Sequence, residues 1–139
     1  MQGSDWVLLS HNLSSGEHVP VSRVQLRVQL ESDAIHLQFS VTNTGDETMR
    51  FTCGLHTYLR VGDISQAQLR GLEQTPWQDA LADLQKRVPD NTPLDAPFNV
   101  DRVYIDAPSK LEISIASERI TIEQSGFNDT VVWLSLIHI

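Results

Sequence analysis

Apolar and polar residues alternate through much of the first third of the chain, as they do in a strand with one buried face. The alternation covers residues 23–30 and 35–42, with apolar positions at Val24, Leu26, Val28, Leu30, Ile35, Leu37, Phe39 and Val41. The short link between the two segments, Glu31 to Ala34, has the length of a hairpin connection. The sequence therefore predicts two strands that pair in antiparallel fashion.

A turn and a third alternating segment follow. In the run from Asn43 to Asp46, Gly45 is free to adopt a positive φ and Asn43 can hydrogen-bond nearby backbone. Alternation then resumes from Met49 and predicts another strand, with Met49, Phe51, Cys53 and Leu55 on one face and Arg50, Thr52, Gly54, His56, Tyr58 and Arg60 on the other. The polar face is either solvated or functional, since Gly54 leaves room for a ligand near the backbone.

The second half is less regular and rich in proline. Residues 65–74 suit a strand with a turn at Gly71, and the stretch from Gln78 to Gln85 has the spacing of a short helix. Val100 to Ile105 suits a strand, and apolar positions at 111, 113, 115, 120 and 122 suit a further hairpin. Five or more strands and almost no helix predict an all-β fold, an antiparallel β-sandwich or a slice of one.

Composition narrows the class of protein. The chain has 139 residues, 40% of them hydrophobic and 20% charged, which suits one folded domain or part of one. A net charge of −8 argues against nucleic acid and anionic membranes as partners. The single cysteine, Cys53, has no disulfide partner, and we expect it to be buried and inert in a reducing cytoplasm. No long apolar run predicts a membrane helix, and no histidine pair has metal-ligand spacing.

Three segments, in order, resemble one family of enzymes. They are VTNTGDETMRFTCGLHTYLRVGDI at 41–64, VDRVY at 100–104 and DTVVW at 129–133, with a weaker match at SDW, residues 4–6. Together they resemble the glucose-6-phosphate 1-epimerases, or hexose-6-phosphate mutarotases, of the aldose 1-epimerase superfamily. That resemblance implies a large antiparallel β-sandwich, of the galactose mutarotase-like supersandwich type, whose concave face holds the sugar.

The resemblance also implies a reaction and assigns residues to it. The family interconverts the α and β anomers of a hexose 6-phosphate without metal or organic cofactor, by opening and closing the sugar ring. Ring opening needs an acid and a base, and histidine, with an ordinary pKa of about 6.5, suits the acid near neutral pH. His56 occupies the family's HTY position as the acid, Asp101 of the DRVY segment is the sugar-hydroxyl acceptor, and Tyr58 is a candidate to line the site.

Other parts of the family's machinery have no counterpart in this sequence. The family's base is a glutamate beyond its DxVVWNP segment, and its phosphate-binding arginines precede the SDW position; Glu118 and Glu123 do not match that glutamate. We therefore expect residues 1–133 to be the central part of a single mutarotase-like domain, truncated at both ends and inactive alone. The full-length protein is expected to be a cytoplasmic monomer that binds a small sugar phosphate.

After Trp133 the family pattern predicts Asn-Pro, but the sequence continues as LSLIHI. This string is the in-frame translation of a common sequencing adapter, so residues 134–139 are interpreted as a non-native tail; the alternative is a genuine apolar strand.

Several residues have structural interpretations beside functional ones. We expect Trp6, Trp77 and Trp133 to be core residues, although each could stack on a sugar. Arg102 is expected to support structure, and His11, His18 and His36 to be solvated. Two other hypotheses for the whole chain remain open: a non-catalytic carbohydrate-binding β-sandwich module and a purely structural fragment.

Overall fold

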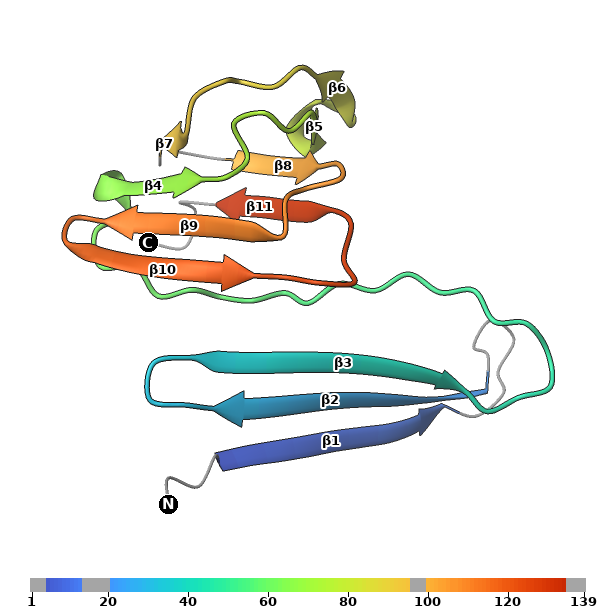
Figure 1. The fold of residues 1–139 in the computed structure, drawn as a ribbon. Helices are drawn as coiled ribbons and strands as arrows, with labels where there is room; N and C mark the ends of the chain where they lie inside the picture. The colour runs from blue at the N-terminus through green and yellow to red at the C-terminus, as the bar shows by residue number, and fades with distance from the viewer. Residues whose placement is uncertain (1–4, 14–20, 96–99, 135–139) are drawn as a thin grey trace. The chain divides into compact units, whose positions relative to one another are not determined.

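The computed structural model describes residues 5–13, 21–95 and 100–134. The chain divides into two compact units, Met1–Cys53 and Gly54–Ile139, which are described separately. Every strand pairing in the described residues is antiparallel, and their helical turns are limited to two short 3₁₀ segments (Figure 1). The predicted all-β antiparallel class is confirmed. No helix within these three ranges is long and apolar enough to cross a membrane.

The first unit is a three-stranded sheet in the order β1-β2-β3, with bounds Asp5–Leu13, Ser22–Leu30 and Ile35–Asn43. In the register, Leu26 lies opposite both Leu9 and Phe39, so most apolar positions of the three strands share one face. The predicted hairpin is confirmed, and its link is closed by the Glu31 amide donating to the Ala34 carbonyl over 2.9 Å.

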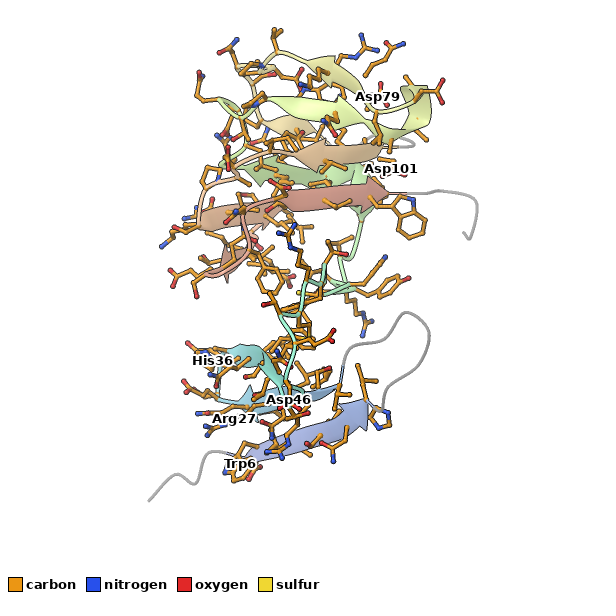
Figure 2. All side chains as sticks on the ribbon, turned by 90° about the vertical axis from the view of Figure 1, so that its right-hand side faces the viewer. Trp6, Arg27, His36, Asp46, Asp79 and Asp101 are labelled. Atoms are coloured by element: carbon orange, nitrogen blue, oxygen red, sulfur yellow. The ribbon has the colours of Figure 1, made fainter. Side chains whose placement is uncertain are left out.

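The polar face of this sheet carries Trp6, which is 56% exposed and has the Arg27 guanidinium 5.1 Å from its ring centroid (Figure 2). The expectation that Trp6 is a core residue is therefore wrong. His11 lies within β1 and is exposed, as expected, while His18 lies outside the described residues. His36 is solvated on β3, as expected, with Nε2 3.4 Å from a Glu31 carboxylate oxygen.

The turn after β3 is organised by a side chain rather than by glycine. Asn43 Oδ1 accepts from the Gly45 amide over 3.0 Å, and Asn43 Nδ2 donates to the Glu47 carbonyl over 2.7 Å. This is the hydrogen bonding expected of Asn43, whereas Gly45 stays outside the positive-φ region.

The strand predicted over 49–60 is wrong. The segment from Thr44 to Asp63 contains no regular secondary structure, and residues 50–60 are all exposed. No described strand pairs with it, so alternation alone did not make a strand, which also requires a neighbour for its backbone amides and carbonyls. Cys53 is exposed here, and the prediction that it is buried on an apolar face is wrong as well.

The second unit contains two four-stranded sheets (Figure 1). One has the order β10-β9-β4-β7, with bounds Glu118–Glu123, Lys110–Ile115, Ala67–Arg70 and Leu94–Asp95. The other has the order β11-β8-β5-β6, with bounds Thr130–Leu134, Val100–Tyr104, Trp77–Asp79 and Gln85–Arg87.

The predicted strands near 65–74, 100–105 and 111–122 are confirmed. The short helix predicted near 78–85 is replaced by a 3₁₀ turn, η2 (Ala80–Ala82), between β5 and β6; a second 3₁₀ turn, η1 (Ile64–Gln66), precedes β4.

A core cluster draws on both of these sheets, which makes the second unit a β-sandwich. It consists of buried Leu72, Trp77, Tyr104 and Leu111, with Leu69, Ala107, Ile122 and Val132 packed against it. Trp77 is 8% exposed, so it is a core residue as expected. Arg102 has the expected structural role: its guanidinium lies 3.8 Å from the Trp77 ring centroid, and its Nη1 donates to Asp90 over 2.6 Å.

The first residue of the suspected tail, Leu134, is the last residue of β11, and residues 135–139 lie outside the described ranges.

Gly71 is the one position of the β4 turn where an added side chain has no room. Its φ is +102°, and a Cβ there would lie 2.8 Å from the Lys110 carbonyl oxygen. Gly71→Ala should therefore lower the free energy of unfolding by about 1–3 kcal/mol, measured by urea denaturation. Gly62→Ala is the matched control, since a Cβ at Gly62 meets nothing within 4 Å. Equal stability of the two variants would contradict this account of the turn.

Candidate functional site

The pairing of β8 with β11 determines which residues face away from the sandwich core. Asp101 lies directly opposite Trp133, and Arg102 lies opposite Val132. Val132 packs against the core cluster, so its neighbour Trp133 points to the outer face of the sheet. Directly opposed residues of an antiparallel pair share a face, with Cβ atoms about 4.5–5.5 Å apart. Asp101, which is labelled in Figure 2, therefore lies beside Trp133 on that outer face.

Trp133 is the point at which His56, in the irregular stretch at the start of the second unit, meets this sheet face. The His56 imidazole lies with its centroid 6.0 Å from the Trp133 ring, at an interplanar angle of 74°, an edge-to-face contact. On its own segment His56 stacks on Tyr58, with centroids 4.7 Å apart and an angle of 24°. Both geometries are ones that aromatic rings prefer.

The three residues proposed from the sequence are thus placed in one neighbourhood. His56 and Tyr58 are in direct contact, and Asp101 adjoins the tryptophan that His56 touches. We call His56, Tyr58, Asp101 and Trp133 the ring cluster. Trp133 was expected in the core, but it is 46% exposed and belongs to this cluster. The signal that could have identified it is strand geometry: if DTVVW is a strand, the successive residues Val132 and Trp133 point to opposite faces, so only one of them can face the core.

The polar groups of the ring cluster are available to a ligand. Among the described residues, neither the His56 imidazole nor the Asp101 carboxylate has a hydrogen-bond or ion-pair partner. Tyr58 is 79% exposed, and His56 is exposed as well. The cluster therefore offers a group that can carry a proton, a carboxylate that can accept from hydroxyls, and aromatic faces.

The residues to which the sequence analysis gave no part in the site, Glu118, Glu123 and Arg102, lie away from the ring cluster. Glu123 forms an ion pair with Lys110 over 3.2 Å on the β9–β10 hairpin, and Glu118 begins the same edge strand. Arg102 points to the opposite side of β8 from Asp101. Within residues 5–13, 21–95 and 100–134, no three His, Cys, Asp or Glu side chains are grouped to hold a metal ion.

Comparison with known proteins covers most of the chain. The pattern that defines aldose 1-epimerases matches residues 7–135. The chain belongs to the aldose 1-epimerase family. The all-β antiparallel fold agrees with this family. Every member of the ring cluster lies within the matched residues.

Two curated relatives of this aldose 1-epimerase chain carry the same name, "Putative glucose-6-phosphate 1-epimerase". The protein from Cenchrus ciliaris is 33% identical over 94 residues, which is 66% of this chain and 29% of the relative. The protein from Haemophilus influenzae is 37% identical over 73 residues, which is 52% of this chain and 24% of the relative. The aligned part of the chain thus spans less than a third of the length of either relative.

The stack between His56 and Tyr58 can be tested directly in solution. Replacing Tyr58→Ala should move the His56 ring-proton resonances downfield, because the aromatic ring that shields them is lost, whereas Tyr58→Phe should leave them nearly unchanged. Two-dimensional NMR of histidine side chains measures both variants, with His56→Gln providing the assignment. The His36 resonances are the internal control, and equal shifts in the alanine and phenylalanine variants would refute the stack.

Proposed function

We propose that residues 1–133 are the central part of a hexose 6-phosphate 1-epimerase in which His56 is the acid. Family membership supports an epimerase acting on a sugar, and the names of the two relatives support glucose 6-phosphate as substrate. The observation that carries the residue assignments is the ring cluster. It brings an imidazole without a hydrogen-bond partner to the outer sheet face that bears the Asp101 carboxylate.

In the proposed reaction, a base removes the proton from the C1 hydroxyl, and the electrons of that O–H bond form the C1 carbonyl. The C1–O5 bond breaks, its electron pair moves to O5, and His56 delivers a proton to O5. The aldehyde rotates about C1–C2, and O5 attacks its other face while His56 takes the proton back and the base returns its own. No atom is gained or lost, so the products are the two anomers.

The other members of the ring cluster are assigned to binding. Asp101 accepts hydrogen bonds from sugar hydroxyls, as a carboxylate without a protein partner is suited to do. Tyr58, stacked on His56 and largely exposed, lines the sugar site. The glutamate base and the phosphate-binding arginines are proposed to lie outside residues 1–133, so the 139-residue chain alone is proposed to be inactive. The complete protein is proposed to be a cytoplasmic monomer, and residues 134–139 a non-native tail.

The acid role of His56 predicts a large kinetic effect. In the full-length protein, His56→Gln should reduce anomerisation of glucose 6-phosphate by about 10²–10⁴-fold, the usual contribution of a positioned acid. Exchange NMR between the two anomers measures the rate, and near-ultraviolet circular dichroism confirms folding. His36→Gln is the matched control, because His36 is an exposed histidine on β3 outside the ring cluster. A near-normal rate in His56→Gln would remove His56 from the reaction. Binding of the sugar phosphate by a folded wild-type protein that does not anomerise it would favour the carbohydrate-binding module.

Asp101→Asn tests the binding role. Losing the charge of a carboxylate that accepts from sugar hydroxyls should cost about 1.5–3 kcal/mol, or roughly 10- to 150-fold in kcat/KM. The control is Asp33→Asn, on the exposed hairpin between β2 and β3. Unchanged kcat/KM in Asp101→Asn would show that Asp101 does not contact the sugar.

A further inference from the structure

We infer that Trp133 is a positioning residue, which holds the His56 imidazole at the outer face of the β8–β11 pair so that it can exchange a proton with the sugar. This inference rests on the proposed function, because it assigns Trp133 a part in the same reaction. It gives Trp133 a role through His56 and not through contact with the substrate.

The backbone around His56 cannot by itself fix the imidazole. His56 lies in the middle of the segment from Thr44 to Asp63, which contains no helix or strand, and its side chain is exposed. Within the described part of the chain, its two ring nitrogens have no hydrogen-bond partner of the kind that usually orients a functional histidine. Its orientation therefore depends on its ring contacts.

Of the two ring contacts, only the one to Trp133 comes from the sheet. Tyr58 is on the same irregular segment as His56, so the stack can move together with that segment. Trp133 is held by the ladder between β11 and β8, and its neighbour Val132 packs against the buried core cluster. The contact between His56 and Trp133 thus ties the imidazole to the rigid part of the unit.

The pairing of β8 with β11 also places the proposed acid near Asp101, the residue proposed to bind the sugar. Because Asp101 lies opposite Trp133, the ring that holds the imidazole is adjacent to the carboxylate proposed to hold the sugar hydroxyls. Proton transfer depends steeply on such relative placement, since small displacements of a reacting group lower rates far more than they lower affinity.

The kinetic test separates positioning from binding. In the full-length protein, Trp133→Ala should lower kcat for glucose 6-phosphate anomerisation by about 10-fold or more with little change in KM, and Trp133→Phe should restore most of kcat. Val131→Ala is the matched control, because Val131 is on the same strand and face and is 59% exposed. A rise in KM at constant kcat would instead make Trp133 a sugar-binding residue, and an unchanged kcat would give it no role; both overturn the inference.

A spectroscopic test follows the contact itself. In the 139-residue chain, Trp133→Ala should shift the His56 ring-proton resonances toward those of a freely rotating histidine, while Trp133→Phe keeps them close to wild type. Trp6→Ala is the control, since Trp6 is exposed on β1 and contacts Arg27. Unshifted His56 resonances in Trp133→Ala would overturn the inference. A wild-type full-length protein without anomerase activity would refute the proposed function, whereas an active protein indifferent to Trp133→Ala would refute this inference alone.

Discussion

The register between β8 and β11 is the constraint on which the ring cluster depends. With Asp101 opposite Trp133, the neighbouring residues Tyr104 and Val132 face the core, where Tyr104 is only 2% exposed. A slip of β11 by one residue would turn Trp133 inward and Val132 outward, which exchanges the faces of the whole strand. Burial of Tyr104 and Val132 against Trp77 and Leu111 therefore stabilises the register and, with it, the outer face that meets His56.

The DRVY segment shows how adjacent residues of one strand take different surroundings. Asp101 faces outward without a partner, whereas Arg102, one residue on, lies over Trp77 and pairs with Asp90. Burial favours the neutral guanidine, but the interactions of the guanidinium with the Tyr104 hydroxyl and then with the Asp90 carboxylate outweigh burial and hold the pKa of Arg102 above its usual value. Arg102 therefore stays charged and keeps the carboxylate of Asp90 engaged, away from the ring cluster.

The alternation of apolar and polar residues predicted some strands of this fold and missed others. Alternation identified β2, β3 and the β9–β10 hairpin because each strand has one apolar face and a pairing partner next to it in sequence. It failed over residues 49–60, where the same pattern occurs without a strand to pair with, and it could not detect β5 or β6, which are three residues long. Val7, Leu8 and Leu9 interrupt alternation, so β1 was not predicted.

The candidate site likewise contains residues that the sequence identified and one, Trp133, that it did not. Motif resemblance singled out His56, Tyr58 and Asp101, and these residues converge because β8 pairs with β11 and Trp133 meets His56. The residue type alone could not distinguish Trp77, which is buried, from Trp133, which is half-exposed. The face on which each tryptophan lies is set by the register of its strand. The proposed role of Trp133 thus depends on strand pairing between residues far apart in sequence.

The distribution of positive charge bears on which end of a sugar phosphate this chain can recognise. In the second unit, Arg87, Arg102 and Arg119 each pair with a carboxylate, Asp79, Asp90 and Glu112 respectively. A phosphate would have to compete with these carboxylates, and the chain as a whole carries a charge of −8. The ring cluster instead combines a proton carrier, a hydroxyl acceptor and aromatic faces, which suit the acid's part of ring opening at C1 and contact with the hydroxyls of a sugar ring. The chemistry on the described residues therefore suits the anomeric end of the proposed substrate, and recognition of its 6-phosphate is proposed to fall to cations that are not already paired.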